Sequence, residues 1–294
     1  AQGIRTVVVD SDSDRVDTLK VADLGVNVPG LCADPADPEV LRLAGLCNPQ
    51  CAGVLALNTE DQANLTVAIS TKLLAPQRPV ISRAAYHDTE ANLTSFGTDY
   101  TLNPFDLFAE RFALALRAPS LFLLYAWLTG ARDDVDPPAP PGEGRWILCG
   151  YGRFGKAIQE RLAFEGIHPV IIEAEPERTE APRTTVVGRG TEAHTLREAG
   201  IAEAAGLIAG TDNDSNNLSI LMTARELNPR LFTVARQWRA HSAPLFQAAR
   251  PDLLMEPGGL LGREVVGLLL TPLLREFLTA VQEHEEAWAN ALLS

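Results

Sequence analysis

The chain has 294 residues, of which 46% are hydrophobic and 21% charged, and its formal net charge is −13. These values are ordinary for a globular protein and allow about two domains with buried cores. The acidic balance argues against a nucleic-acid partner, which usually needs a basic face. The most apolar stretches, 112–128 and 258–282, are too short or too charged to span a bilayer, so we expect buried helices there.

In the first half, short apolar runs alternate with helical patterns, which favours a parallel sheet with helices on both faces. Residues 7–10, Val-Val-Val-Asp, form the first such run and end on an acid. The strands predicted in this half are 6–10, 28–32, 52–57, 78–83 and 99–102. A long apolar helix near 104–129, broken by Pro119, follows the last strand.

Residues 131–144 are rich in proline and lack apolar periodicity, which predicts a surface linker between domains 1–130 and 145–294. The strands predicted in the second half are 145–149, 169–173, 184–188, 205–210, 231–236 and 252–255. A second apolar helix near 257–282 is again broken by a proline. The cysteines, Cys32, Cys47, Cys51 and Cys149, lack zinc-ribbon spacing, and we expect free thiols in a reducing cytoplasm.

The most informative motif follows the strand 145–149. A G-x-G-x-x-G turn leads into a helical pattern, a second strand and an acid about 20 residues on, which predicts a dinucleotide-binding βαβ unit. The glycines permit a tight turn, approach of the backbone to a pyrophosphate and close helix packing, and the helix start favours phosphate. The acid binds ribose hydroxyls and disfavours a 2′-phosphate. The predicted binding residues here are Gly150, Tyr151, Gly152, Arg153, Phe154, Gly155 and Glu173. The alternative is that the glycines serve packing alone.

The second half repeats the first, with two small gaps. Corresponding residues include Gly3 and Gly166, Asp10 and Glu173, Asn64 and Asn217, Arg83 and Arg236, Pro104 and Pro257, and Pro119 and Pro272. A counterpart of the glycine turn and its strand would lie ahead of Asp10 and is not in the sequence. Because that strand would be central in the sheet, we expect the chain to be cut from a longer polypeptide.

Several segments carry a resemblance to a known family. They are ILCGYGRFG (147–155), GRGTEAHTLREAGIAEA (188–204) and AGTDNDSNNLSILMTARELNPR (209–230), with ADPADPEVLRLAGL (33–46) and LNTEDQANLTVAI (57–69) in the first copy. With these segments the chain resembles tandem RCK proteins, also called KTN or TrkA-N proteins. Those are the cytoplasmic regulatory modules of potassium channels and transporters, and they carry out no catalysis.

The resemblance implies an α/β fold of two tandem Rossmann-like, doubly wound parallel sheets, each followed by a proline-broken crossover helix. That helix would pack on a neighbouring lobe, so lobes would self-associate within a chain, as a dimer or as a ring. The ligand would be NAD(H), ADP or ATP, with calcium at an acidic cleft as a further option. The membrane partner would be a channel or transporter subunit, fused or separate, at the inner face of the membrane.

Additional site residues come from both the family pattern and the strand ends. Gly188 keeps the family glycine, but Arg189 replaces its acid, which would favour a more phosphorylated ligand or abolish binding. Thr211 and Asp212 follow a strand at the carboxyl edge of the sheet, where ligands of α/β folds bind. In the first copy Asp10 and Asp34 take the places of the acids.

Alternatives remain open for three of these features. Asp212 and Asp214 could instead cap the next helix. Arg83 and Arg236 end corresponding strands, so a phosphate contact and a salt bridge between lobes are equally compatible with either. Asp10, Asp12 and Asp14 imitate a calcium loop, but the glycine and bidentate glutamate of an EF-hand are missing. We interpret them as a ribose-binding acid followed by turn and capping acids.

Two other functions compete with the regulatory one. An NAD-dependent dehydrogenase would need a substrate domain, whereas only a helix and a tail follow residue 255. A structural ring element with degenerate sites would keep the fold and bind no nucleotide.

Overall fold

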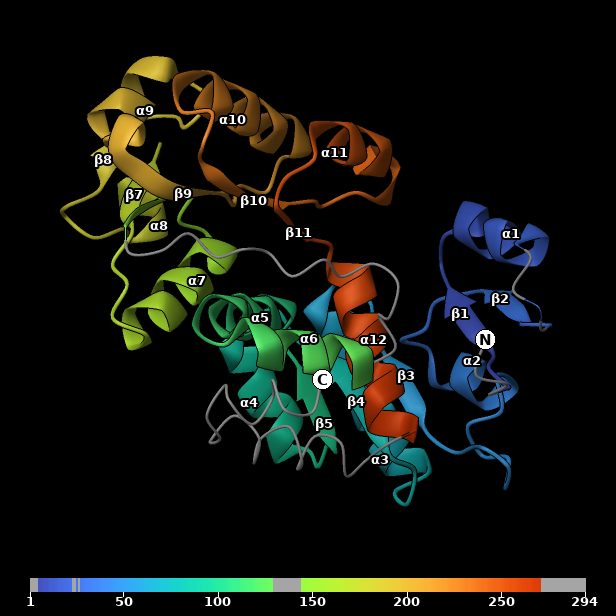
Figure 1. Ribbon diagram of the computed structural model, residues 1–294. Helices are drawn as coiled ribbons and strands as arrows, with labels where there is room; N and C mark the ends of the chain where they lie inside the picture. The colour runs from blue at the N-terminus through green and yellow to red at the C-terminus, as the bar shows by residue number, and fades with distance from the viewer. Residues whose placement is uncertain (1–4, 23–24, 26, 129–143, 271–294) are drawn as a thin grey trace. The chain divides into compact units, whose positions relative to one another are not determined.

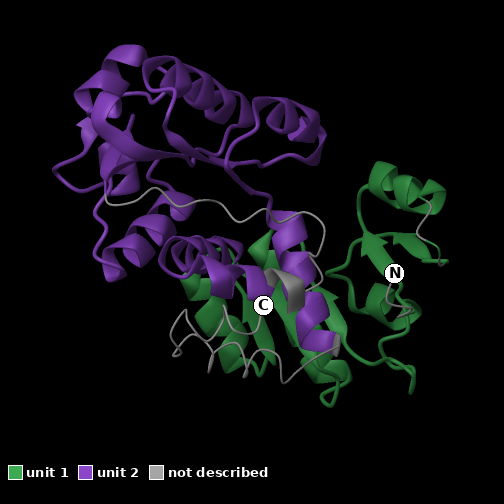
Figure 2. Ribbon diagram, viewed as in Figure 1, with its two compact units in different colours: residues 1–103 green, residues 104–294 purple. Residues whose placement is uncertain are grey.

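The computed structural model describes residues 5–22, 25, 27–128 and 144–270. The chain forms two compact units that divide between Asn103 and Pro104 (Figure 2). The predicted linker, except Gly144, and the predicted helix break at Pro272 lie outside the described residues. Among the described helices, none is long and apolar enough to cross a membrane.

The second unit contains a six-stranded parallel sheet in the order β11-β10-β9-β6-β7-β8 (Figure 1). Its strands are β6 (Arg145–Cys149), β7 (Val170–Glu173), β8 (Val186–Val187), β9 (Ala204–Ala209), β10 (Phe232–Arg236) and β11 (Leu253–Met255). The chain runs outward from β6 to β8 and then returns to β9 on the other side, so β6 lies at the topological switch point. The predicted doubly wound fold is confirmed.

Both faces of this sheet are covered, which explains why the sequence of β6 is continuously apolar. Residues 146–149 are all buried. Ile147 and Cys149 join the core beneath α10, whereas Trp146 contacts the rings of Phe112 and Phe232. The helices are α7 (Arg153–Phe164), α8 (Pro176–Thr179), α9 (Ala193–Glu198), α10 (Asp214–Leu227), α11 (Ala243–Ala249) and α12 (Pro257–Leu270). In Figure 1, α9, α10 and α11 cover one face of the sheet, and α7 lies on the other.

The apolar helix at the end of the first copy is part of the second unit. It forms α5 (Pro104–Arg117) and α6 (Pro119–Leu128), and the break falls at the predicted proline. Helix α5 packs against α7, with the ring centroids of Phe108 and Phe154 5.5 Å apart. Phe112 meets Trp146 edge-on at 5.3 Å. The first copy's helix therefore crosses onto the second lobe and completes its core.

The first unit contains two smaller parallel sheets, β1-β2 and β3-β4-β5. Its strands are β1 (Val8–Asp10), β2 (Gly30–Cys32), β3 (Val54–Ala56), β4 (Val80–Arg83) and β5 (Tyr100–Leu102). Its helices are α1 (Ser13–Val21), α2 (Pro38–Leu43), α3 (Asp61–Leu74) and α4 (His87–Ser95). By the repeat, these sheets correspond to the two sides of the second lobe's sheet, and the described residues contain no counterpart of β6.

Several strands are shorter than predicted. The predicted strand 28–32 begins only at Gly30, since Pro29 has no N–H to donate to a ladder and contributes only its carbonyl, to Val8. In the second lobe, the amide of Thr185 bonds back to the carbonyl of Pro182, so this segment turns before β8 begins.

Candidate nucleotide site

The glycine turn between β6 and α7 has the backbone geometry that its sequence predicts. Gly150 has a φ of +95°, which favours glycine, and its amide bonds to Ile172 O at 2.9 Å. A Cβ on Gly155 would overlap the carbonyl oxygen of Gly150 and lie 3.1 Å from its carbon. A Cβ on Gly152 would meet no atom within 4 Å. The first and third glycines thus serve the turn and the packing, and the second borders open space.

Helix α7 begins beside that open space. Its N-cap is Gly152, and no side chain caps the helix. The first amides of an uncapped helix carry partial positive charge and need acceptors. Phe154, which is fully buried, anchors the first turn against α5. The local structure therefore presents donors for an anion on a rigid support.

Glu173 ends β7 next to this turn and is 9% exposed. Its carboxylate accepts bonds from the amides of Tyr151 at 2.6 Å and Glu175 at 3.0 Å. An ionised carboxylate offers about four acceptor positions, so two such bonds leave capacity for ribose hydroxyls. The side chain of Tyr151 points elsewhere, because its hydroxyl lies 3.1 Å from Gln159 Oε1. The backbone amide of Tyr151, and not its side chain, is therefore part of the turn.

A buried asparagine joins the carboxyl ends of β9 and β10. The Asn217 side-chain oxygen accepts bonds from the amide and hydroxyl of Thr211, at 2.9 and 2.7 Å. Its nitrogen donates to Thr211 O at 3.0 Å and Arg236 O at 2.8 Å. The amide, hydroxyl and carbonyl of Thr211 are therefore all engaged within the protein. The internal repeat of the sequence aligns Asn217 with Asn64. The sequence does not predict a role for either residue, because their hydrogen-bond partners lie on other strands and loops.

Helix α10 is capped by Asn213, whose side chain accepts a bond from Asn216 N at 3.0 Å. The alternative that Asp212 or Asp214 caps this helix is therefore wrong. Asp214 instead accepts bonds from the amides of Trp238 at 2.6 Å and Arg239 at 3.0 Å, which fixes the loop after β10. Asp212 is exposed beside the strand ends, and its ligand role stays a prediction.

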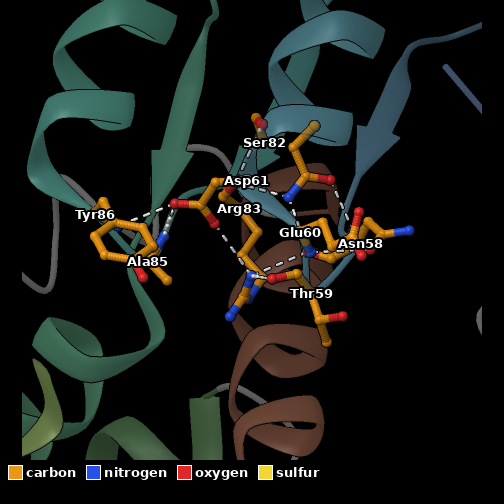
Figure 3. A network of polar contacts seen from close by, with 9 residues as sticks. Asn58, Thr59, Glu60, Asp61, Ser82, Arg83, Ala85 and Tyr86 are labelled. Atoms are coloured by element: carbon orange, nitrogen blue, oxygen red, sulfur yellow. Dashed lines mark hydrogen bonds and ion pairs between the residues drawn. The ribbon is translucent and has the colours of Figure 1, made fainter. Parts of the chain in front are cut away.

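The first lobe repeats the backbone bonds of this asparagine and this aspartate (Figure 3). Asn64 bridges Asn58 and the carbonyl of Arg83. Asp61 accepts bonds from the amides of Ala85 and Tyr86, at 2.7 and 3.0 Å. Arg83 forms an ion pair with Asp61 at 3.4 Å, a partner within its own lobe that neither predicted alternative named.

Two arginines flank the start of α7. Arg236 is 5% exposed, and its guanidinium lies 4.9 Å from the ring centroid of Trp238 and 5.0 Å from that of Phe105. Arg153 is exposed, and its guanidinium lies 5.4 Å from the same Phe105 ring. Cation–π contacts of this kind hold a guanidinium over the ring, and Arg236 Nη1 also donates to Thr211 O at 3.5 Å. Phe105 belongs to α5, so the crossover helix touches both candidate phosphate ligands.

The remaining predicted residues lie at strand ends. The amide of Gly188 bonds to Glu173 O at 3.1 Å, which places the Gly188-Arg189 turn next to β7, and the Arg189 side chain is exposed. In the first lobe, Asp10 accepts a bond from Asp12 N and Asp34 one from Ala36 N.

These acids of the first lobe hold local turns. Asp12 caps α1, as expected for a turn and capping acid. Calcium at these acids and nucleotide binding by Asp10 or Asp34 stay predictions.

The family model of the TrkA-N domain matches residues 1–104 and 146–257. The chain belongs to the TrkA-N domain family. Because both halves match, it carries two TrkA-N regions in tandem, and the resemblance seen in the sequence is confirmed.

The TrkA-N regions have relatives among potassium transport proteins. "Potassium channel protein 1" of Methanocaldococcus jannaschii is 30% identical over 147 residues, which cover 48% of this chain and 44% of the relative. The glutathione-regulated potassium-efflux system protein KefC of Escherichia coli is 31% identical over 108 residues, covering 35% of this chain and 17% of the relative. The chain spans less than half the length of either relative.

Solved structures of GsuK share the fold. A mutant form of GsuK matches with a TM-score of 0.66 and 21% identity, over 92% of this chain and 63% of GsuK. GsuK bound to ADP matches with a TM-score of 0.64 and 22% identity, over 92% and 64% of the two chains. GsuK bound to NAD matches with a TM-score of 0.64 and 18% identity, over 90% and 59%. The tandem RCK architecture of this TrkA-N chain is therefore established as a fold.

Proposed function

We propose that this chain is the cytoplasmic, non-catalytic regulatory module of a potassium channel or transporter at the inner face of the membrane. It senses an adenine nucleotide, NAD(H), ADP or ATP, in its second lobe. The observation that carries the proposal is the glycine turn, where an uncapped helix start and open space at Gly152 adjoin the carboxylate of Glu173. The relatives named as potassium channel and efflux proteins, and GsuK bound to ADP and to NAD, support it.

The proposed binding mode assigns one role to each group. The amides of the turn and of the first residues of α7 bind the phosphates, assisted by Arg153 and Arg236. Glu173 accepts bonds from the ribose hydroxyls while it keeps the turn in place. A 2′-phosphate would bring negative charge to this carboxylate, so NADP should bind more weakly than NAD.

Transmission to a membrane partner is proposed to begin at Phe105. The guanidinium groups of Arg153 and Arg236 both lie over its ring. Phosphate binding would draw either guanidinium toward the turn and so change the packing of the first turn of α5. Because α5 connects the two copies, motion at this point changes the hinge between lobes.

The test is a thermal-shift titration of the chain with NAD⁺, NADH, ADP and ATP, with NADP⁺ for comparison. A ligand at 100 times its Kd should add about 2.7 kcal/mol of stability, which raises the Tm by roughly 5 to 10 °C for a lobe of this size. Hydrogen exchange of the α5 amides should slow in the same samples. The absence of stabilisation by every nucleotide would favour a structural ring element, and turnover of NADH with a substrate would favour a dehydrogenase.

A further inference from the structure

Helices α5 and α12 occupy the same place in the two copies of the repeat. They start at Pro104 and Pro257, and the same spacing relates Arg111 of α5 to Glu264 of α12, which are 153 residues apart. These corresponding residues touch each other, since Arg111 Nη2 donates to Glu264 Oε2 at 2.8 Å. A position that meets its own counterpart lies on the approximate two-fold axis of an isologous contact.

This ion pair is largely shielded from solvent. The side chains of Arg111 and Glu264 are 13% and 11% exposed. Tyr125 of α6 reinforces the pair, because its hydroxyl donates to Glu264 Oε2 at 2.6 Å and its ring lies against the guanidinium of Arg111. The neighbouring positions on the two helices are buried and apolar. On α12 they are Leu261, Val265 and Leu268, and on α5 they are Phe108 and Phe112, whose rings face Phe154 and Trp146.

Because the two-fold axis passes through this position, each helix would meet its partner there with the same residue in a like pair. The charge of that residue therefore decides which helices can pair. Two copies of α5 would bring Arg111 against Arg111, and two copies of α12 would bring Glu264 against Glu264. Like charges at a desolvated contact cost several kcal/mol, whereas the mixed pair is attractive. We propose that Arg111 and Glu264 select pairing of the first crossover helix with the second, and exclude pairing of like helices between chains.

Stability alone does not account for the pair. Replacing a buried ion pair by apolar residues of similar volume is often neutral or stabilising, whereas removing one partner is costly. Discrimination against wrong partners, by contrast, requires a repulsive element. The proposal concerns assembly of the lobes, and it holds whether or not a nucleotide binds.

Charge reversal tests the contact in the full 294-residue chain. Arg111→Glu and Glu264→Arg each create a like-charge pair, and each should lower the Tm by roughly 6 to 20 °C. The double variant should regain most of that loss, because it restores an opposite pair. Arg263→Glu on α12 and Glu110→Arg on α5 are matched controls, since they make the same substitutions at adjacent exposed positions. A double variant as unstable as the single ones would overturn the proposal.

Double variants without charge at residues 111 and 264 test whether the ion pair selects the partner helix. Arg111→Met with Glu264→Met removes both charges and keeps the volume, so the chain should stay folded. Without like-charge repulsion, assemblies through like helices should increase by more than about tenfold, corresponding to at least 1.4 kcal/mol. Light scattering after size exclusion measures their masses at equal concentration. The pair Arg111→Gln with Glu264→Gln provides the same measurement if the methionine pair does not fold. Unchanged masses in the folded neutral variant would show that the pair has no selective role.

Discussion

Substitution of Gly155 by alanine separates the packing role of the glycine turn from its proposed binding role. The added methyl would overlap the carbonyl oxygen of Gly150, a backbone atom that no side-chain rotation can move. Overpacking of this kind costs roughly 1 to 3 kcal/mol, and more where the neighbour cannot yield. The better helix propensity of alanine returns about 1 kcal/mol. We expect the free energy of unfolding to fall by about 2 kcal/mol in total, which lowers the Tm by roughly 4 to 8 °C.

Gly152→Ala is the matched substitution, because its Cβ meets no atom within 4 Å and its φ of −72° suits any residue. Without ligand, the free energy of unfolding of this variant should stay within about 1 kcal/mol of that of the unsubstituted chain. Alanine is a poorer N-cap than glycine, but it also reduces the backbone freedom of the unfolded chain, and the two effects offset each other. The methyl would occupy the approach to the helix start, so stabilisation by ADP or NAD⁺ should fall sharply. Calorimetry of both variants, with and without nucleotide, measures these effects. An unchanged Tm for Gly155→Ala would refute the packing argument, and full nucleotide stabilisation of Gly152→Ala would refute the binding mode.

Three further predictions concern the second lobe. Asn217→Leu should cost several kcal/mol in urea unfolding, because each buried group that it leaves unpaired costs about 1 to 3 kcal/mol, whereas the exposed Asn216→Leu should cost little. Asp214→Asn should speed tryptic cleavage at Arg239, whose amide it holds, and Asp212→Asn should not. Burial raises the pKa of the Cys149 thiol from 9.0 to about 12, so the unfolded state ionises first. The stability contribution of the thiol is therefore complete below about pH 9 and is lost as the pH rises toward 12, by about 1.4 kcal/mol per unit, and Cys149→Ala should flatten this decline.

Local patterns predicted the parts of the fold that local sequence determines. The apolar run 146–149, the glycine turn and the acid at 173 follow one another in the chain, so the βαβ unit could be derived from spacing alone. The proline break in the first crossover helix follows equally from the chemistry of one residue.

The interactions that cross between elements could not be derived in this way. The spacing of Phe105, Phe108 and Phe112 indicates an apolar face on α5, but it does not say that the face packs on α7 of the other copy. Asn217 resembles any polar residue in a helix until β9 and β10 supply its partners. The sequence leaves the neighbouring acids open as caps of α10, because Asp and Asn are nearly equal as caps, and the structure has Asn213 in that position.

A comparison of corresponding residues in the two lobes distinguishes those that stabilise the fold from those with a proposed role in binding. The bridging asparagine and the clamping aspartate occur in both lobes and bind corresponding backbone groups. These bonds therefore position the strand ends of each lobe. Differences between corresponding residues are therefore more informative than identities. Arg83 is engaged by an aspartate, whereas Arg236 lies over aromatic rings beside the turn.

The same comparison applies to the crossover helices. Gly258 stands where α5 carries Phe105, and Glu264 stands where it carries Arg111. The proposed coupling of the nucleotide site to α5 and the proposed choice of its partner helix thus depend on positions at which the copies have diverged. Exchanging these residues between the copies should disturb the proposed sensing and assembly while the strand-end networks stay intact, because Asn217 and Asp214 bind backbone groups of Thr211, Arg236, Trp238 and Arg239 and not of either exchanged position.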